Sequence, residues 1–238
     1  MPPAGWLRTV AQYARAADVP LICDEIQSGL GRTGRWFAFE HEDIVPDVVL
    51  LSKSLGGLGL PLSVIIYHER FDRWLPGAHA GTFRGNQMAM AAGIAAIEFM
   101  RAHGIVEHAA ELGARLLDDL RGALGSSALV RDIRGRGLMI GLEMASSEAA
   151  QRMREACLRR GLIVEIGGRD DSVMRLLPPL VLTDGQALRI VEILADAERA
   201  LLGSASGGPP DGTLRQRSVP RPVAAYPPPD AGEPAPQP

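Results

Sequence analysis

Lys53 is the only lysine in this chain of 238 residues, and the other 24 of its 25 Lys and Arg residues are arginine. A lysine amine can lose its proton and act as a nucleophile, whereas an arginine guanidinium stays charged. A lone lysine is therefore a candidate for chemistry that needs a neutral amine, above all Schiff-base formation. Composition alone leaves a second interpretation open, in which one lysine simply remains in a sequence biased towards arginine.

Two short apolar segments must position this lysine. Residues 19–23 (VPLIC) predict a buried strand that is followed by Asp24, and residues 47–51 (DVVLL) predict a second strand that ends just before Lys53. A glycine-rich loop (residues 28–34) lies between them. Ligands of open α/β sheets bind outside the carboxyl ends of the strands. If the two strands are parallel neighbours, Asp24 and Lys53 lie close together at that edge.

The rest of the chain predicts helices and strands in two groups. Strands linked by helices indicate an α/β sheet in the first group, and the second group forms a smaller α+β domain. In the first group we expect an amphipathic helix over 5–17, a third strand over 62–67 and a long buried helix over 86–101. In the second we expect helices over 105–122, 147–160 and 183–202, and strands over 130–134, 138–143, 162–166 and 173–177.

Two local signals mark the end of the folded region. Thr183 and Gln186 have the spacing of a capping box at the start of the last helix. Ten of the 18 prolines lie between Pro209 and Pro238, mixed with small residues. This composition cannot bury enough apolar surface to order itself, so residues 203–238 are predicted to be a disordered tail.

Composition excludes several classes of function. A net charge of −3 gives no basic field for nucleic acid. Cys23 and Cys157 have neither metal-ligand spacing nor the pattern of a disulfide framework, so no metal site is expected. No apolar run approaches the roughly 20 residues that cross a bilayer, and the N-terminus lacks the regions of a signal peptide. We expect a soluble cytoplasmic protein that does not bind membranes.

Four ordered motifs resemble the class III (ω-amino acid) aminotransferases. They are DEIQSGLGRTG (24–34), LSKSLGG (51–57), GTFRGN (81–86) and MRLLPP (174–179). The resemblance covers nearly all of residues 5–202. The third motif, with Arg84 before Gly85 and Gln87 in place of a proline, is similar to the 2,4-diaminobutyrate:2-oxoglutarate aminotransferases of this family.

The resemblance implies a fold and an activity. The expected fold is α/β, the fold-type-I architecture of pyridoxal-phosphate-dependent transferases, with a mixed, mostly parallel sheet. Residues 1–103 would be the C-terminal part of the large cofactor-binding domain, and residues 104–202 the small C-terminal domain. The implied cofactor is pyridoxal 5'-phosphate (PLP), the substrates are small amino and keto acids, and the active unit is a homodimer. Glutamate would donate its amino group to aspartate 4-semialdehyde, which gives 2,4-diaminobutyrate and 2-oxoglutarate.

The resemblance also implies roles for cofactor-binding residues. Lys53 would form the Schiff base and then move the proton between the substrate carbon and the cofactor C4′. Asp24 would pair with the pyridine nitrogen, and Gln27 would hydrogen-bond the ring 3-oxygen. Ile26 would pack on one face of the ring. From the residues alone, Asp24 could equally be a strand-end carboxylate or a helix cap, and Ile26 an ordinary core residue.

Two further residues have implied roles outside the pyridine ring. Thr82 would reach the cofactor phosphate of the neighbouring subunit, although a hydroxyl that caps the helix near Asn86 is an alternative. Arg175 would bind a substrate carboxylate, because a planar guanidinium grips a carboxylate through two hydrogen bonds. The alternative for Arg175 is an ordinary salt bridge. Arg32 is expected to shape its loop rather than to contact substrate.

The resemblance is to the C-terminal half of these enzymes. Neither a Gly-Ser phosphate loop nor a ring-stacking aromatic residue precedes Asp24. We therefore expect the 238-residue chain to hold PLP weakly by itself. Three alternatives follow from the sequence: an inactive or split fragment, an aminotransferase for another ω-amine, and a semialdehyde aminomutase.

Overall fold

Two β-sheets organise the chain in the computed structural model, which describes residues 2–57 and 59–204. The first part contains α1 (Trp6–Ala16), β1 (Ile22–Asp24), η1 (Ala38–Glu42), β2 (Val48–Leu51), η2 (Lys53–Gly56), β3 (Val64–Tyr67), η3 (Glu69–Phe71) and α2 (Gln87–Ala102). The second part contains α3 (Ile105–Leu124), β4 (Val130–Arg136), β5 (Met139–Met144), α4 (Ser147–Leu158), β6 (Glu165–Gly167), β7 (Val173–Leu176) and α5 (Asp184–Ser204).

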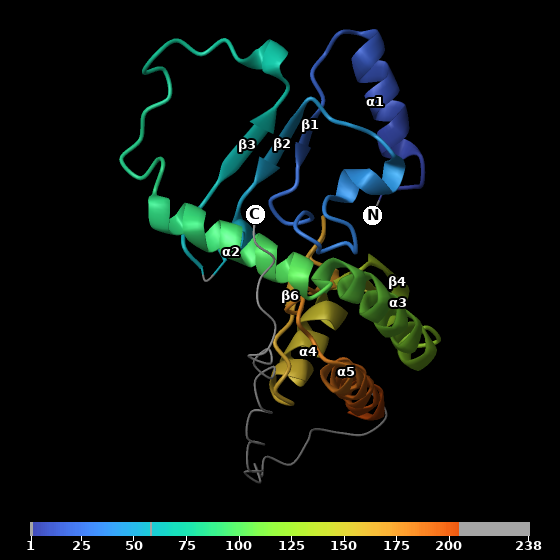
Figure 1. Ribbon diagram of the computed structural model, residues 1–238. Coiled ribbons are helices and arrows are strands. Elements are labelled where there is room, and N and C mark those ends of the chain that lie inside the picture. The colour runs from blue at the N-terminus through green and yellow to red at the C-terminus, as the bar shows by residue number, and fades with distance from the viewer. Residues whose placement is uncertain (1, 58, 205–238) are drawn as a thin grey trace.

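The first sheet carries the segment around Lys53. Its strand order is β1-β2-β3, with β1 parallel to β2 and β2 antiparallel to β3. The predicted parallel pairing of the first two strands is therefore confirmed, and the sheet is mixed. Figure 1 shows α1 beside β1 and α2 crossing near the lower ends of β2 and β3. A small apolar cluster around Leu30, Val49, Leu51 and Leu55 holds this part together.

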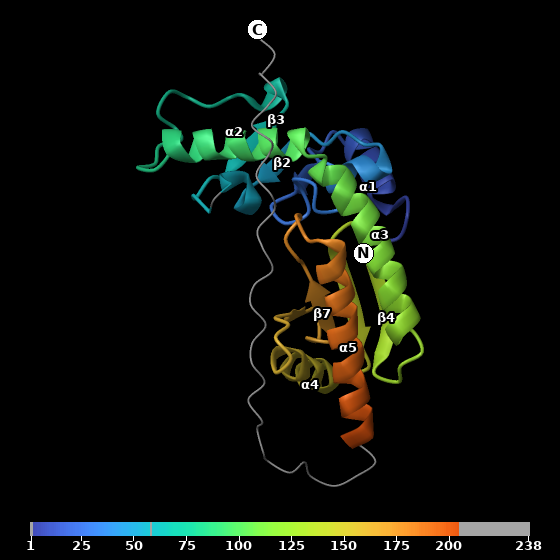
Figure 2. The same ribbon diagram turned by 60° about the horizontal axis from the view of Figure 1, so that its bottom comes forward.

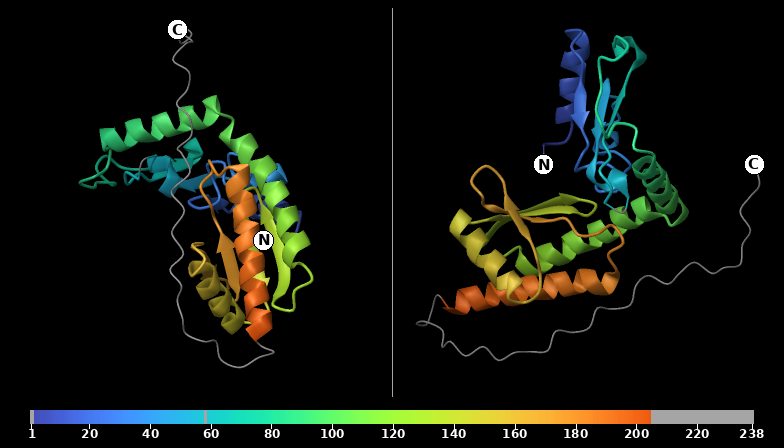
Figure 3. Two further views of the ribbon diagram at one scale, coloured as in Figure 1. Left: turned by 90° about the horizontal axis from the view of Figure 1, so that it is seen from below. Right: turned by 90° about the vertical axis from the view of Figure 1, so that its left-hand side faces the viewer.

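The second sheet has the order β4-β5-β7-β6, and all of its neighbouring strands are antiparallel. The helices α3, α5 and α4 lie side by side along it (Figures 2 and 3). Along β5 the burial alternates between half-buried and buried residues, as expected for a strand with one covered face. The larger core lies between this face and the helices. Its fully buried members include Leu116, Leu142, Met153, Met174 and Leu194.

A close backbone contact joins the two parts. The turn between β4 and β5 contains Gly137, whose carbonyl oxygen would lie 2.1 Å from a Cβ atom on Gly113 of α3. The turn is equally close to the glycine-rich loop, because a Cβ atom added to Gly137 would lie 2.5 Å from the carbonyl carbon of Thr33. The Leu138 N–H also donates to the Arg32 carbonyl over 3.0 Å. The turn is thus enclosed between α3 and the glycine-rich loop, and only glycine fits there.

The last helix begins as its sequence predicts. The Thr183 N–H donates to the Gln186 side chain over 2.9 Å, and the Gln186 N–H donates to the Thr183 hydroxyl over 3.3 Å. These reciprocal bonds satisfy two amides at the start of α5 and confirm the predicted capping box. The predicted tail begins inside α5, and its residues 205–238 lie outside the described residues.

Three expectations about the elements are wrong. The long helix was expected to be buried, yet only Ala89 and Gly93 of α2 are buried, while Met88 is 73% and Ile94 is 58% exposed. An alanine-rich segment that is apolar all round does not indicate which face finds a partner, and within the described residues α2 packs mainly against η2 and α3. The third strand starts at Val64, two residues later than expected.

The strand predicted over 162–166 is displaced towards the C-terminus. The ladder between β6 and β7 covers Glu165–Gly167. The Leu162 N–H instead donates to the Cys157 carbonyl and completes the end of α4. Within the described residues, no single helix has both the length and the apolar character to cross a bilayer; α2 and α3 meet these criteria only together and are bent by 63° at their break.

Candidate functional site

Asp24 and Lys53 lie at the same edge of the first sheet. Asp24 ends β1 and pairs with Leu50 of the parallel strand β2, and Lys53 follows the end of β2 after Ser52. The parallel pairing of β1 and β2 therefore agrees with the prediction that Asp24 and Lys53 lie at the carboxyl edge of the sheet. Both side chains are exposed. The strand that precedes Lys53 is largely covered, since Val49 and Leu51 of β2 are buried.

The backbone at Lys53 is strained and tightly supported. Its φ of +50° lies in the left-handed region, which is unfavourable for a residue with a side chain. The Ser52 hydroxyl donates to the Leu62 carbonyl over 3.1 Å and fixes the residue just before it. Helix α2 packs against η2 at Gly93, where a Cβ atom would lie 2.7 Å from the Leu55 carbonyl oxygen. These contacts hold Lys53 in a conformation that it would not adopt freely.

The functional groups of three residues remain available for a ligand. One oxygen of Asp24 accepts from the Ile26 N–H over 3.0 Å, which leaves its other oxygen without a partner in residues 2–57 and 59–204. Across the same ranges, the amine of Lys53 and the amide of Gln27 make no hydrogen bond or ion pair. An amine for an aldehyde, a carboxylate for a pyridinium N–H and an amide for a ring oxygen fit the pyridoxal ring. Ile26 is half-buried beside them.

Glu25 shapes the glycine-rich loop, a role that the sequence did not reveal. Its side chain is only 4% exposed. It accepts from the Ser28 hydroxyl over 2.6 Å and from the Phe39 N–H over 3.0 Å. Its position beside Asp24 was the available signal, because two adjacent acids at a strand end have alternate side-chain directions. The buried carboxylate therefore connects the end of β1 to the loop and to η1.

Arg32 anchors this loop to the second sheet. Its guanidinium donates to the Leu138 carbonyl over 3.2 Å and to the Pro178 carbonyl. Burial lowers the pKa of Arg32, because desolvation disfavours the charged form. The expectation that Arg32 shapes the loop is confirmed. It also connects the loop to the MRLLPP segment, which carries Arg175.

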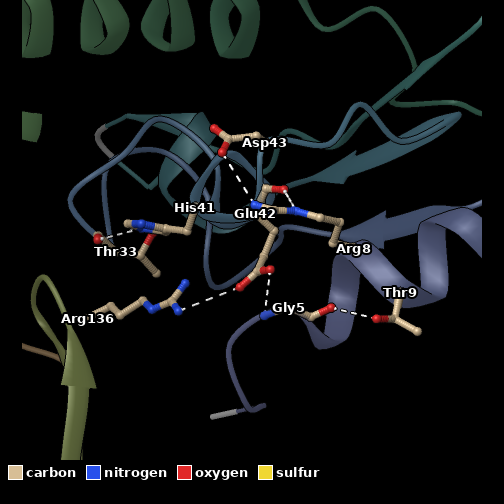
Figure 4. A network of polar contacts seen from close by, with 8 residues as sticks. All are labelled: Gly5, Arg8, Thr9, Thr33, His41, Glu42, Asp43 and Arg136. Carbon is tan, nitrogen blue, oxygen red and sulfur yellow. Dashed lines mark hydrogen bonds and ion pairs between the residues drawn. The ribbon is translucent and has the colours of Figure 1, made fainter.

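A second polar network lies beside the loop (Figure 4). Glu42, at 8% exposed, accepts from the Gly5 N–H over 2.9 Å, and its other oxygen lies 3.9 Å from Nη2 of Arg136. His41 Nε2 lies 3.1 Å from the Thr33 carbonyl oxygen. The network therefore connects the start of α1, η1, the glycine-rich loop and the end of β4.

Stability should fall as His41 takes up a proton. Burial lowers its pKa, and the nearby Arg136 lowers it further. Because the folded pKa is below the unfolded one, the unfolded state binds more protons in this range. The stabilising contribution is therefore complete above about pH 6.5 and is lost as the pH falls through the lowered pKa. Melting temperatures at pH 7.5 and 5.5 should differ less in His41→Gln than in the unaltered chain. His79→Gln, in an exposed loop, should behave like the unaltered chain; an equal effect of both changes would exclude His41.

Thr82 and Arg175 lie on different elements. Thr82 is exposed in the loop that precedes α2, remote in sequence from the first sheet edge. It does not cap that helix, because the Asn86 side chain accepts from the Met88 and Ala89 N–H groups. Arg175 is half-buried in β7, and its Nη2 lies 3.2 Å from Oε2 of Glu165. The salt bridge weighed as the alternative for Arg175 is thus present.

Comparison with known proteins identifies a family. Residues 1–197 match the family described as Aminotransferase class-III. The chain is 46% identical over 209 residues to a diaminobutyrate–2-oxoglutarate aminotransferase of Rhizobium meliloti, covering 82% of this chain and 44% of that protein. It is 40% identical over 202 residues to an ornithine aminotransferase of Exiguobacterium, covering 83% of this chain and 49% of that protein.

Solved structures agree with this match. The ornithine aminotransferase of Toxoplasma gondii superposes with a TM-score of 0.80 at 33% identity, covering 85% of this chain and 48% of that one. An acetylornithine aminotransferase of Elizabethkingia anophelis gives a TM-score of 0.78 at 29% identity, over 84% of this chain and 50% of the other. The fold is therefore that of the fold-type-I PLP-dependent aminotransferases. The chain spans about half the length of the relatives that it matches.

Proposed function

The chain belongs to the class III aminotransferases, and on that premise we propose that it moves an amino group from glutamate to aspartate 4-semialdehyde. The products are 2-oxoglutarate and 2,4-diaminobutyrate. The observation that carries the proposal is the parallel pairing of β1 and β2, which brings Asp24 and the only lysine to one sheet edge. The 46% identity to a diaminobutyrate–2-oxoglutarate aminotransferase supports this choice of substrates.

Four residues of the first sheet edge would hold the pyridoxal ring. Lys53 would bond to the aldehyde carbon, and Asp24 would keep the ring nitrogen protonated. Gln27 would donate to the ring 3-oxygen, and Ile26 would cover one ring face. When bound, PLP supplies an electron-accepting ring that stabilises negative charge on the substrate carbon.

Lys53 would also act as the base of the reaction. Its neutral Nζ would take the proton from the substrate carbon that bears the amine and pass it to the cofactor C4′, and it would carry a proton in the opposite direction when the second substrate receives the amino group. The left-handed backbone of Lys53 and the hydrogen bond of the neighbouring Ser52 fix the position from which the lysine side chain extends. A base held in place in this way loses less entropy when it reaches its substrate.

Arg175 would select carboxylate substrates. A guanidinium binds a carboxylate through two parallel N–H donors, which fixes the orientation of the substrate as well as its charge. Arg32 would keep the segment that carries Arg175 near the loop that follows Asp24, because it bonds the Pro178 carbonyl. Glutamate and 2-oxoglutarate each carry two carboxylates and suit such a site.

The remaining parts of the proposal concern assembly. Thr82, exposed before α2, would reach the cofactor phosphate of a second copy, so the active unit would be a homodimer. The division of the chain into parts at 1–103 and 104–202, and a cytoplasmic location, remain predictions.

A second candidate activity has support of its own. Ornithine aminotransferases are among the most similar relatives and structures, at 40% and 33% identity. Ornithine differs from diaminobutyrate by one methylene, and a pocket discriminates one methylene by only about 10- to 200-fold. The chain could therefore accept the longer ω-amine as an alternative substrate.

The proposal is tested by adding PLP in large excess to the purified chain, because the chain by itself is expected to hold PLP weakly, and by measuring two signals. The first is the visible absorption of an imine that borohydride traps on Lys53. The second is glutamate formed from 2-oxoglutarate with diaminobutyrate or ornithine as the donor. Glutamate formed faster with diaminobutyrate supports the proposed substrate. If PLP is trapped on Lys53 but diaminobutyrate gives no glutamate, the proposed cofactor site is supported and diaminobutyrate is excluded as the substrate. If neither signal is seen, the proposed activity of this chain is contradicted.

A further inference from the structure

We propose that Glu25 positions Gln27, and that it thereby sets the affinity of the first sheet edge for a hydroxypyridine ring. This inference rests on the role of Gln27 towards the ring 3-oxygen in the proposed function. Glu25 would be a positioning residue, because its side chain is only 4% exposed and its carboxylate contacts other groups of the chain.

The backbone of Glu25 begins a tight turn that contains Gln27. The Glu25 N–H donates to the Leu50 carbonyl of β2 over 3.0 Å, so the start of the turn is tied to the sheet. The Glu25 carbonyl accepts from the Gly29 N–H over 2.9 Å and closes the turn. A Cβ atom on Gly29 would lie 2.8 Å from that carbonyl oxygen, so the closure leaves no room for a side chain. Gln27 is therefore held inside a turn that Glu25 both starts and closes.

The carboxylate of Glu25 fastens the far side of this turn. Its Oε2 accepts from the hydroxyl of Ser28, the residue after Gln27, over 2.6 Å. Its Oε1 accepts from the Phe39 N–H of η1 over 3.0 Å. Hydrogen bonds in a buried environment are stronger than in water, and an unpaired buried carboxylate oxygen is unfavourable. Both oxygens of Glu25 therefore resist displacement, and through them the turn is fixed to η1.

Gln27 depends on this support because its own side chain has none. Its amide makes no hydrogen bond or ion pair within residues 2–57 and 59–204. Its position is set by the backbone on either side, where Asp24 accepts from the Ile26 N–H over 3.0 Å and Glu25 holds Ser28. Hydrogen bonds weaken steeply when their distance or angle departs from the ideal. A loosened turn would therefore weaken the bond from Gln27 to a ring oxygen.

A general contribution of Glu25 to stability is the competing explanation, and the chain contains a matched control. Glu42 of η1 is also a buried acid, at 8% exposed, and it accepts from the Gly5 N–H over 2.9 Å. The change Glu42→Gln preserves the shape of the side chain and alters the net charge exactly as Glu25→Gln does. An effect that arises only from lost charge or lost stability should therefore appear in both variants.

The first measurement follows the ¹⁵N-labelled chain without ligand. Glu25→Gln should shift the backbone amide signals of Ile26 and Gln27 and lower their heteronuclear NOE, because an amide cannot accept through both of its terminal atoms. Ser28→Ala removes only one of the two contacts and should have a smaller effect in the same direction. Glu42→Gln should leave both signals in place. Thermal unfolding of each variant checks that the fold is retained.

The second measurement titrates the chain with pyridoxine 5'-phosphate, which has the ring nitrogen and the 3-hydroxyl but no aldehyde for Lys53. Glu25→Gln and Gln27→Ala should each raise its Kd by about 3- to 10-fold, the net effect of one hydrogen bond. Glu42→Gln should change it by less than about 2-fold. The double variant of Glu25 and Gln27 should bind no more weakly than Gln27→Ala alone, because the group that Glu25 positions is then absent.

The outcomes separate this inference from the proposed function. If Glu25→Gln and Ser28→Ala leave the Gln27 signals unchanged, or if the two single effects on Kd multiply in the double variant, Glu25 does not act through Gln27 and only this inference is overturned. If Gln27→Ala binds as tightly as the unaltered chain, or the unaltered chain does not bind, the cofactor role of Gln27 in the proposed function fails. The signals of the free chain then still decide whether Glu25 positions Gln27.

Discussion

Replacing Lys53 with alanine is expected to abolish borohydride-stable attachment of PLP and to lower transamination by about 10²- to 10⁴-fold or more, since both the covalent bond and the base are lost. Lys53→Arg should be equally inactive, although it keeps the positive charge, because a guanidinium cannot supply a neutral amine. The measurements are the visible spectrum with PLP, mass spectrometry after borohydride, and the rate of glutamate formation.

The composition of the chain makes this result easy to interpret. Lys53 carries the only lysine amine in the sequence, so a trapped adduct inside the chain has one place to form. The α-amino group at the N-terminus is the internal control, and peptide mapping separates the two. Trapping that persists at full level in Lys53→Ala would show that the first sheet edge is not the cofactor site.

A methyl group at Gly113 is expected to destabilise the fold by about 2–3 kcal/mol or more. The added Cβ would lie 2.1 Å from the Gly137 carbonyl oxygen, and backbone on both sides prevents a small adjustment. For a folded region of about 200 residues, this corresponds to a fall in Tm of roughly 5–10 °C. Thermal unfolding of Gly113→Ala followed by circular dichroism measures the effect.

Gly122 provides the control on the same helix. It is exposed in α3, and a Cβ atom there would have no neighbour within 4 Å. Gly122→Ala should therefore stabilise the chain by about 0.5–1 kcal/mol, because alanine favours the helix and restricts the unfolded chain. If the two substitutions shift the Tm in the same direction, the contact between α3 and the turn at Gly137 is not as tight as the structure describes.

Local patterns in the sequence predict much of the fold. The apolar run before Lys53, the amphipathic pattern of α3 and the Thr183–Gln186 capping box all depend on neighbours a few residues away, and each element forms where it was expected. Parallel pairing of β1 and β2 also follows, because a strand, a crossover and a second buried strand favour that arrangement.

The features that the sequence did not predict depend on distant partners. The contact of Arg32 with Pro178 joins residues 146 positions apart, and no local pattern announces it. The pairing of Glu165 with Arg175 depends on the register of β6, which begins three residues later than expected. The exposure of α2 depends on what covers an apolar helix, and hydropathy alone does not provide that information.

The candidate site was partly predictable from the sequence. The resemblance to the class III aminotransferases groups Lys53, Asp24 and Gln27 as a proposed set, and the pairing of β1 with β2 brings Asp24 and Lys53 to one sheet edge. The sequence does not predict the left-handed backbone at Lys53, because a lysine would ordinarily avoid that conformation. Nor does it distinguish the exposed carboxylate of Asp24 from the buried one of Glu25, which differ only in the direction of the side chain.

The contact that Arg32 makes across 146 residues also bears on the order in which the chain folds. The hairpin of β4 and β5 closes over a few residues, so it can form early, whereas the glycine-rich loop reaches its anchors only after most of the chain is in place. The loop should then be unstructured in the folding transition state. Substitution of Arg32 should speed unfolding and leave the folding rate nearly unchanged. The glycine-rich loop beside Asp24 would be the last part to assemble and the first to open.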